Sequence, residues 1–130
     1  MAWVGRKYKL DSSENFDEYM KELGVGIVLR KVGLSVHPTC YMEQRGDVFH
    51  YFNESTFKNF ELTFKLGEEK EQETADGRKV LTTFTLDGNT LTQVEKCQKR
   101  SVIVRVFSET EMVATSTYGD VTATRTYKAV

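Results

Sequence analysis

The sequence has little proline, little cysteine, no long apolar run and almost no net charge. Its 130 residues include one proline and two cysteines, and 18 basic side chains stand against 19 acidic ones, which gives a net charge of -1. Without a basic excess, we do not expect a general nucleic-acid binder that relies on phosphate neutralisation. No apolar run approaches the length of a membrane span, and the first ten residues contain no secretory h-region. We therefore expect a cytoplasmic protein in which Cys40 and Cys97 remain free thiols.

Enzyme motifs and metal-site motifs are missing as well. His37 and His50 have no metal-ligand spacing with the two cysteines, and the chain contains no nucleophile elbow and no glycine-rich phosphate loop after a strand. We therefore expect no enzyme, no metal and no cofactor. One enzymatic alternative is kept, a lipid isomerase that uses Cys40.

The length allows one domain, residues 1–130, with a single core. A strand is predicted over residues 3–10, and the stretch DSSENFDEYMKELG that follows has a helical period. Asn15 and Glu18 have the spacing of a capping box, and Gly24 supplies a C-terminal stop. The sequence therefore predicts a short amphipathic helix after the first strand.

A second short helix is predicted after Gly26 and ends near Gly33, before Pro38. Its predicted apolar stripe consists of Val25, Val28, Leu29 and Val32. Beyond Pro38, turn signals recur about every 8–12 residues and separate nine further strands, a spacing typical of antiparallel sandwiches and barrels. Closure into a barrel would protect the sheet edges, and ten strands leave room for an internal cavity. We therefore predict an all-β, ten-stranded antiparallel barrel with the helical hairpin over one open end.

Two arginines fall on apolar faces of predicted strands. In the terminal VTATRTYKAV, a period of two places Arg125 and Tyr127 among small apolar side chains, and Arg105 has apolar neighbours in residues 101–107. A buried guanidinium needs a strong acceptor, and a ligand carboxylate would suit its planar fork, with the Tyr127 hydroxyl as a further donor. The pattern leaves an alternative open, in which an internal glutamate, backbone carbonyls or water satisfy the two arginines.

Several short motifs run in order over essentially the whole chain: SENFDEYMKELGVG, HPT, GDV, ESTFKN, ETADGRK and the terminal TRTYK. Together they resemble the intracellular fatty acid-binding proteins. The resemblance implies an up-and-down barrel, or β-clam, with a helix-turn-helix lid between the first and second strands. It also implies one internal site in which Arg105, Arg125 and Tyr127 hold the carboxylate of a long-chain fatty acid. The function expected from it is transport or buffering of that acid without chemical change.

The resemblance also implies which residues lie near the acyl tail and the portal: Phe16, Tyr19, Met20, Val25, Val32, Pro38, Phe57, Asp76 and Arg78. Three further residues depart from an aliphatic pocket and are expected to face inward: Cys40, Tyr51 and Asn53. A more polar cavity leaves open an alternative ligand, a retinoid or another bulky hydrophobic carboxylate.

Three basic residues of the lid, Lys21, Arg30 and Lys31, match a region that contacts anionic membranes in this family and carries a nuclear-import surface in some members. A solvated helix face is the alternative for these three residues. We expect a monomer whose partners are the fatty acid and, transiently, anionic membranes.

Overall fold

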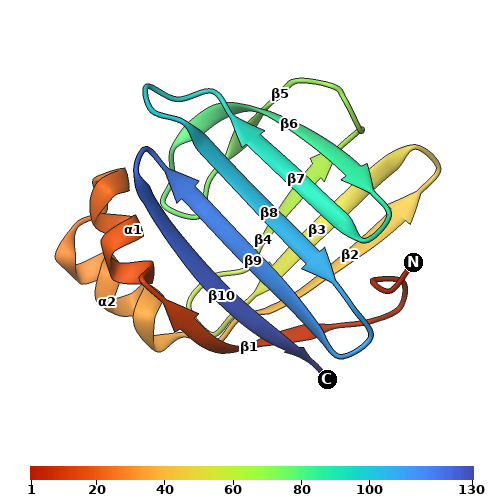
Figure 1. The fold of residues 1–130 in the computed structure, drawn as a ribbon, viewed down its shortest axis with the longest axis horizontal. Helices are drawn as coiled ribbons and strands as arrows, with labels where there is room; N and C mark the ends of the chain where they lie inside the picture. The colour runs from red at the N-terminus through yellow and green to blue at the C-terminus, as the bar shows by residue number, and fades with distance from the viewer.

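The computed structural model describes residues 1–130 and contains ten strands and two helices. Figure 1 shows both helices at one end of the barrel, with the N-terminus far from them. The elements are β1 (Tyr8–Glu14), α1 (Phe16–Leu23), α2 (Ile27–Ser35), β2 (Thr39–Arg45), β3 (Val48–Glu54), β4 (Phe60–Phe64), β5 (Lys70–Glu73), β6 (Lys79–Asp87), β7 (Thr90–Glu95), β8 (Ser101–Phe107), β9 (Glu111–Tyr118) and β10 (Val121–Ala129). The predicted fold class is confirmed. No helix is long and apolar enough to cross a bilayer.

All ten strands belong to one sheet, in the order β4-β3-β2-β1-β10-β9-β8-β7-β6-β5. Sequence neighbours pair antiparallel everywhere except between β4 and β5, and β1 also pairs with β10. Strands β4 and β5 share no ladder, so the prediction that closure removes the edges is wrong at this one place. Side chains seal the gap: Lys70 Nζ and Gln72 Nε2 donate to the Thr63 carbonyl at 3.0 and 2.7 Å. The rings of Phe64 and Phe84 stack with centroids 3.7 Å apart.

The first strand is shifted from its predicted position of residues 3–10. Residues 2–5 form a turn, and β1 continues through Glu14 because its polar second half pairs with β10. The register shifts between Leu10 and Ser12, where one residue is bulged. Long-range pairing therefore overrides the helical pattern of residues 11–14.

The predicted capping box is also wrong. Asn15 has φ 61° and makes no side-chain capping bond. Instead, its Nδ2 donates to the carbonyl of Thr122 at 2.9 Å, which ties the start of α1 to the beginning of β10. Gly24 ends α1 with φ 88°, as predicted, and its N–H bonds to the carbonyls of Lys21 and Met20.

The inner face of α2 differs by one residue from the predicted stripe. Val25, Leu29 and Val32 line the interior beside Val36, whereas Val28 is 76% exposed. The helix begins at Ile27, so Val28 lies on its outer side. Ion pairs hold the two helices together and to the barrel, from Arg30 to Asp17 at 3.0 Å and from Lys99 to Glu22.

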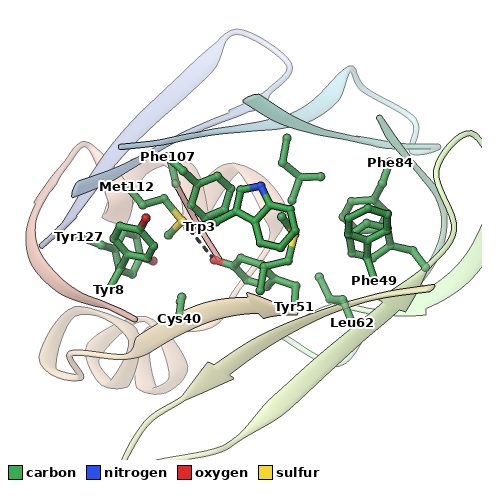
Figure 2. Packing of buried hydrophobic residues seen from close by; sticks show 14 of the residues in the cluster. Trp3, Tyr8, Cys40, Phe49, Tyr51, Leu62, Phe84, Phe107, Met112 and Tyr127 are labelled. Atoms are coloured by element: carbon green, nitrogen blue, oxygen red, sulfur yellow. Dashed lines mark hydrogen bonds between the residues drawn. The ribbon is translucent and has the colours of Figure 1, made fainter. Parts of the chain in front are cut away.

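The apolar core fills the half of the barrel away from the helices. Figure 2 shows Tyr8 and Phe107 on one side of this cluster, the stack around Phe49 and Phe84 on the other, and Trp3 between them. The Phe49 ring stacks on Phe64 at 5.6 Å, which extends the stack across the sheet. Aromatic side chains fill this half, and the cavity described below lies beneath the helices.

Candidate ligand-binding site

An internal cavity of about 250 Å³ lies between the helical hairpin and the inner faces of the strands. Thirty-one residues line it, and 16 of them are hydrophobic. Side chains of α1 and α2 form its roof, and polar side chains gather on β7 and β8 and on the last strand. A mostly apolar cavity with a few converging polar groups is the usual form of a small-molecule site.

Arg105 enters this cavity from β8 and is only 8% exposed. Its Nη1 donates to Oε1 of Gln93 on β7 at 2.7 Å. The guanidinium carbon lies 4.4 Å from the centroid of the Tyr51 ring, within range of a cation–π contact. A neutral amide and an aromatic face are therefore the acceptors that the protein itself provides for this cation.

Arg125 enters from β10 and contacts the lid. Its guanidinium carbon lies 3.9 Å from the Phe16 ring of α1, and its Nε donates to Ser13 Oγ at 3.1 Å. The predicted alternation of this strand is confirmed, since Ala123 and Tyr127 are buried on the same face while Thr122 and Lys128 are exposed.

Neither arginine has a carboxylate partner. None of the ion pairs in the chain includes Arg105 or Arg125. Uncompensated cations in a low-dielectric cavity are costly, and an anionic ligand lowers that cost. The positive field of two guanidiniums therefore makes this part of the cavity suited to a carboxylate.

Tyr127 belongs to the core cluster, and its ring centroid lies 5.9 Å from the guanidinium carbon of Arg125. Its side chain is 5% exposed and lines the cavity. Burial raises the pKa of its hydroxyl far above the ordinary value, and the neighbouring Cys40 thiol adds to this effect although the two arginines oppose it. The phenol therefore stays protonated and can donate a hydrogen bond to an anion.

Eleven of the twelve residues predicted near the tail and the portal line the cavity. The cavity lining includes Phe16, Tyr19, Met20, Val25, Val32, Pro38, Tyr51, Asn53, Phe57, Asp76 and Arg78. Phe57 is 55% exposed, as expected of a residue at an opening. Arg78 Nε is paired with Asp76 Oδ2 at 2.7 Å, so this third cavity arginine is already neutralised.

Cys40 is the exception, because it is fully buried in the core cluster and is not among the lining residues. Its Sγ accepts a hydrogen bond from Asn53 Nδ2 at 3.4 Å. Burial raises the pKa of the thiol, which disfavours the nucleophilic thiolate. Cys40 therefore faces inward, as predicted, but it packs in the core cluster and is not part of the cavity lining.

Two of the three basic lid residues, Lys21 and Arg30, are paired with acidic side chains. Lys21 pairs with Asp17 and Glu18, at 3.5 and 3.2 Å. Arg30 has a side chain only 14% exposed, pairs with Asp17 and donates to the carbonyl of Val25 at 2.8 Å. Lys31 is exposed and enters no ion pair.

Two polar residues of the site were not singled out from the sequence, Gln93 and Glu95 on β7. Gln93 accepts from Arg105 and its Nε2 lies 3.3 Å from Glu95 Oε2, while Ser101 Oγ donates to Glu95 Oε1 at 2.7 Å. The alternation in TLTQVE contains the signal, because it places Leu91, Gln93 and Glu95 on one face.

The fold and the cavity together define a barrel that can enclose a small molecule with an apolar body and an anionic group. The model of the lipocalin / cytosolic fatty-acid binding protein family matches residues 4–130. The chain belongs to this family.

Curated relatives and solved structures agree with this assignment. A muscle fatty acid-binding protein of Schistocerca gregaria is 49% identical over 129 residues, which cover 98% of this chain and 96% of that protein. The structure of a fatty acid-binding protein in brain tissue of Drosophila melanogaster has 53% identity and a TM-score of 0.92, with 97% of this chain and 98% of that chain covered. The Schistosoma mansoni fatty acid binding protein in complex with arachidonic acid has 41% identity and a TM-score of 0.93, with 99% and 96% covered.

Proposed function

We propose that this protein is an intracellular carrier that binds a long-chain fatty acid non-covalently inside the barrel and transports or buffers it. The observation that carries the proposal is the pair of cavity guanidiniums, Arg105 and Arg125, without a carboxylate partner. Relatives named for fatty-acid binding, one of them in complex with arachidonic acid, support the same ligand class.

In this proposal Arg105, Arg125 and the protonated hydroxyl of Tyr127 hold the carboxylate. The acyl chain extends toward α2 and Phe57, along the apolar part of the lining. Each buried methylene contributes about 0.8 kcal/mol of transfer free energy, so the chain supplies most of the affinity. The anchor then sets the orientation of the ligand and selects acids over alcohols.

The carrier works without catalysis. The enzymatic alternative would need a reactive thiolate at Cys40, and burial of this thiol raises its pKa and keeps it protonated. The family, which is described as cytosolic, supports a cytoplasmic site of action.

Exchange of ligand with membranes is proposed to occur at the lid. Ile27, Val28 and Leu34 of α2 are exposed apolar side chains. Lys31 is the one lid cation without an acidic partner, so apolar contact supplies most of this interaction and electrostatics little. For the same reason the lid cations are proposed as part of a solvated face, and we propose no nuclear-import surface.

The proposal is tested on the protein purified from cells. Native mass spectrometry followed by lipid extraction should find a long-chain fatty acid bound, and calorimetric titration of the delipidated protein should give saturable binding. Competition between a fluorescent fatty acid and retinoic acid separates a fatty-acid carrier from a carrier of bulkier carboxylates. Protein that carries no lipid and binds neither ligand would refute the proposal.

A further inference from the structure

Glu95 is a cavity carboxylate that the fatty-acid anchor does not use. It lies on the inner face of β7, lines the cavity and is 6% exposed. Its two oxygens accept from different protein donors, Oε1 from Ser101 Oγ at 2.7 Å and Oε2 from Gln93 Nε2 at 3.3 Å. No ion pair in the chain includes Glu95.

This hydrogen-bond network fixes the carboxylate as an acceptor. Arg105 has only N–H donors, so the amide oxygen of Gln93 must face Arg105 and its NH₂ group must face Glu95. Both oxygens of Glu95 therefore receive hydrogen bonds, as expected of the ionised form. A carboxylate has about four acceptor positions, and these two donors fill only two of them.

An unsubstituted acyl chain has no donor for the two remaining acceptor positions of the Glu95 carboxylate. Methylenes packed against an ionised carboxylate remove water and return no hydrogen bond, which raises the cost of burying the charge. A hydroxyl on the chain would donate to Glu95 at the same place. We propose that Glu95 determines specificity by selecting long-chain acids that carry a hydroxyl on the acyl chain, an inference that rests on the proposed fatty-acid function.

The register of the strands indicates where that hydroxyl lies. Arg105 reaches Gln93, and Glu95 is two residues further along β7, which corresponds to about 7 Å along a strand. A ligand carboxylate at Arg105 therefore places the selected hydroxyl several carbons away from the carboxyl group. A hydroxyl on the adjacent carbon would lie too close to the arginines to reach Glu95.

A rival explanation is that Glu95 only balances nearby positive charge. Arg78 and Arg105 are close enough to act electrostatically in this region, and the Tyr19 hydroxyl of α1 lies near Glu95 as well. Charge balance affects every bound acid alike, because each carries the same carboxylate. The ratio of affinities for hydroxylated and unsubstituted acids therefore separates selection from charge balance.

The experiment measures binding of octadecanoic acid and of monohydroxyoctadecanoic acids that differ only in the position of the hydroxyl. In the wild type, at least one mid-chain isomer should bind about 10-fold more tightly than the parent acid, the size expected of a hydrogen bond to a charged group. The isomer with its hydroxyl beside the carboxyl group should show no such gain. Glu95→Met should abolish the preference, and Glu95→Gln should reduce it because a neutral acceptor bonds more weakly.

Glu73→Gln is the matched control, since Glu73 also lines the cavity but is exposed, and it should retain the wild-type preference. If Glu95→Met does not fold, the Glu95→Gln ratio decides. A wild type without any positional preference, or a preference that survives both Glu95 variants, would overturn the proposal while leaving fatty-acid binding intact. Failure of the wild type to bind octadecanoic acid itself would instead refute the proposed function.

Discussion

Replacement of Arg105 by methionine tests the carboxylate anchor most directly. The substitution keeps an unbranched side chain of moderate length and removes the charge and the donors. In the structure this cation meets only Gln93 Oε1 at 2.7 Å and the Tyr51 ring at 4.4 Å. A charge-assisted hydrogen bond to a ligand carboxylate contributes about 1.5–3 kcal/mol, so Arg105→Met should weaken fatty-acid binding by about 10- to 100-fold.

The empty protein should tolerate this change. Arg105 is 8% exposed and has no carboxylate partner, so its removal relieves a buried cation. The losses are one hydrogen bond to Gln93 and one cation–π contact of about 0.5–2 kcal/mol. These terms nearly cancel, and we expect the Tm of the ligand-free variant to stay close to that of the wild type.

Calorimetric titration with a fatty acid and with the alcohol of the same chain length provides the assay. The acid should lose affinity in Arg105→Met, whereas the alcohol, which carries no charge, should be little affected. Arg78→Met is the control, because Arg78 lines the same cavity but is already paired with Asp76 at 2.7 Å. An equal loss for acid and alcohol, or unchanged acid binding, would show that Arg105 does not hold the carboxylate.

Three further predictions follow from the portal, the thiols and the buried phenols. Phe57, whose side chain is 55% exposed, is tested by Phe57→Ala. This variant should bind long acids a few-fold more weakly, bind short acids as before and release ligand faster in stopped-flow measurements. Equal effects on all chain lengths would contradict the placement of Phe57 at the portal. Cys97, which is partly exposed, should react with a thiol reagent at pH 8 well before the fully buried Cys40. Mass spectrometry of the labelled peptides measures the order, and labelling of Cys40 first would contradict the prediction. Burial raises the pKa of Tyr19 from 10.0 to about 12, so the stability linked to it is present below pH 10 and is lost as pH rises toward 12. Urea unfolding over this range should show a shallower loss in Tyr19→Phe, and identical slopes would contradict this assignment.

Strand patterns were the part of the structure that the sequence predicted best. The alternation in residues 121–129 identified Arg125 and Tyr127 as inward-facing, and the same rule placed Arg105 correctly. These predictions succeeded because a barrel strand has one wet face and one enclosed face, so a period of two is decisive. Glu95 obeys the same rule. A search of the inward strand faces for carboxylates as well as for cations would have found it.

Features that depend on distant pairing could not be predicted. Asn15 departs from a capping geometry because its amide bonds to the carbonyl of Thr122, 107 residues away. Cys40 shares the inward face of β2, but whether an inward side chain meets the ligand or the core depends on its height in the barrel, and Cys40 lies within the core cluster. The ion pair across the lid could not be predicted for a similar reason, since it joins Asp17 of α1 to Arg30 of α2.

Because β4 and β5 share no ladder, the circumference of the barrel can change at this one place. In a barrel whose ladder closes completely, the strand number and the stagger fix the circumference, and widening it anywhere breaks backbone hydrogen bonds. Here the circumference can change where no backbone bond joins the strands, at the expense of two side-chain bonds to the Thr63 carbonyl and the Phe64–Phe84 stack. A change of circumference at this line would leave the other nine strand junctions in register. Any change in the width of the barrel is therefore confined to the line between β4 and β5. There, a few side-chain contacts rather than backbone hydrogen bonds resist the entry of a bulkier ligand.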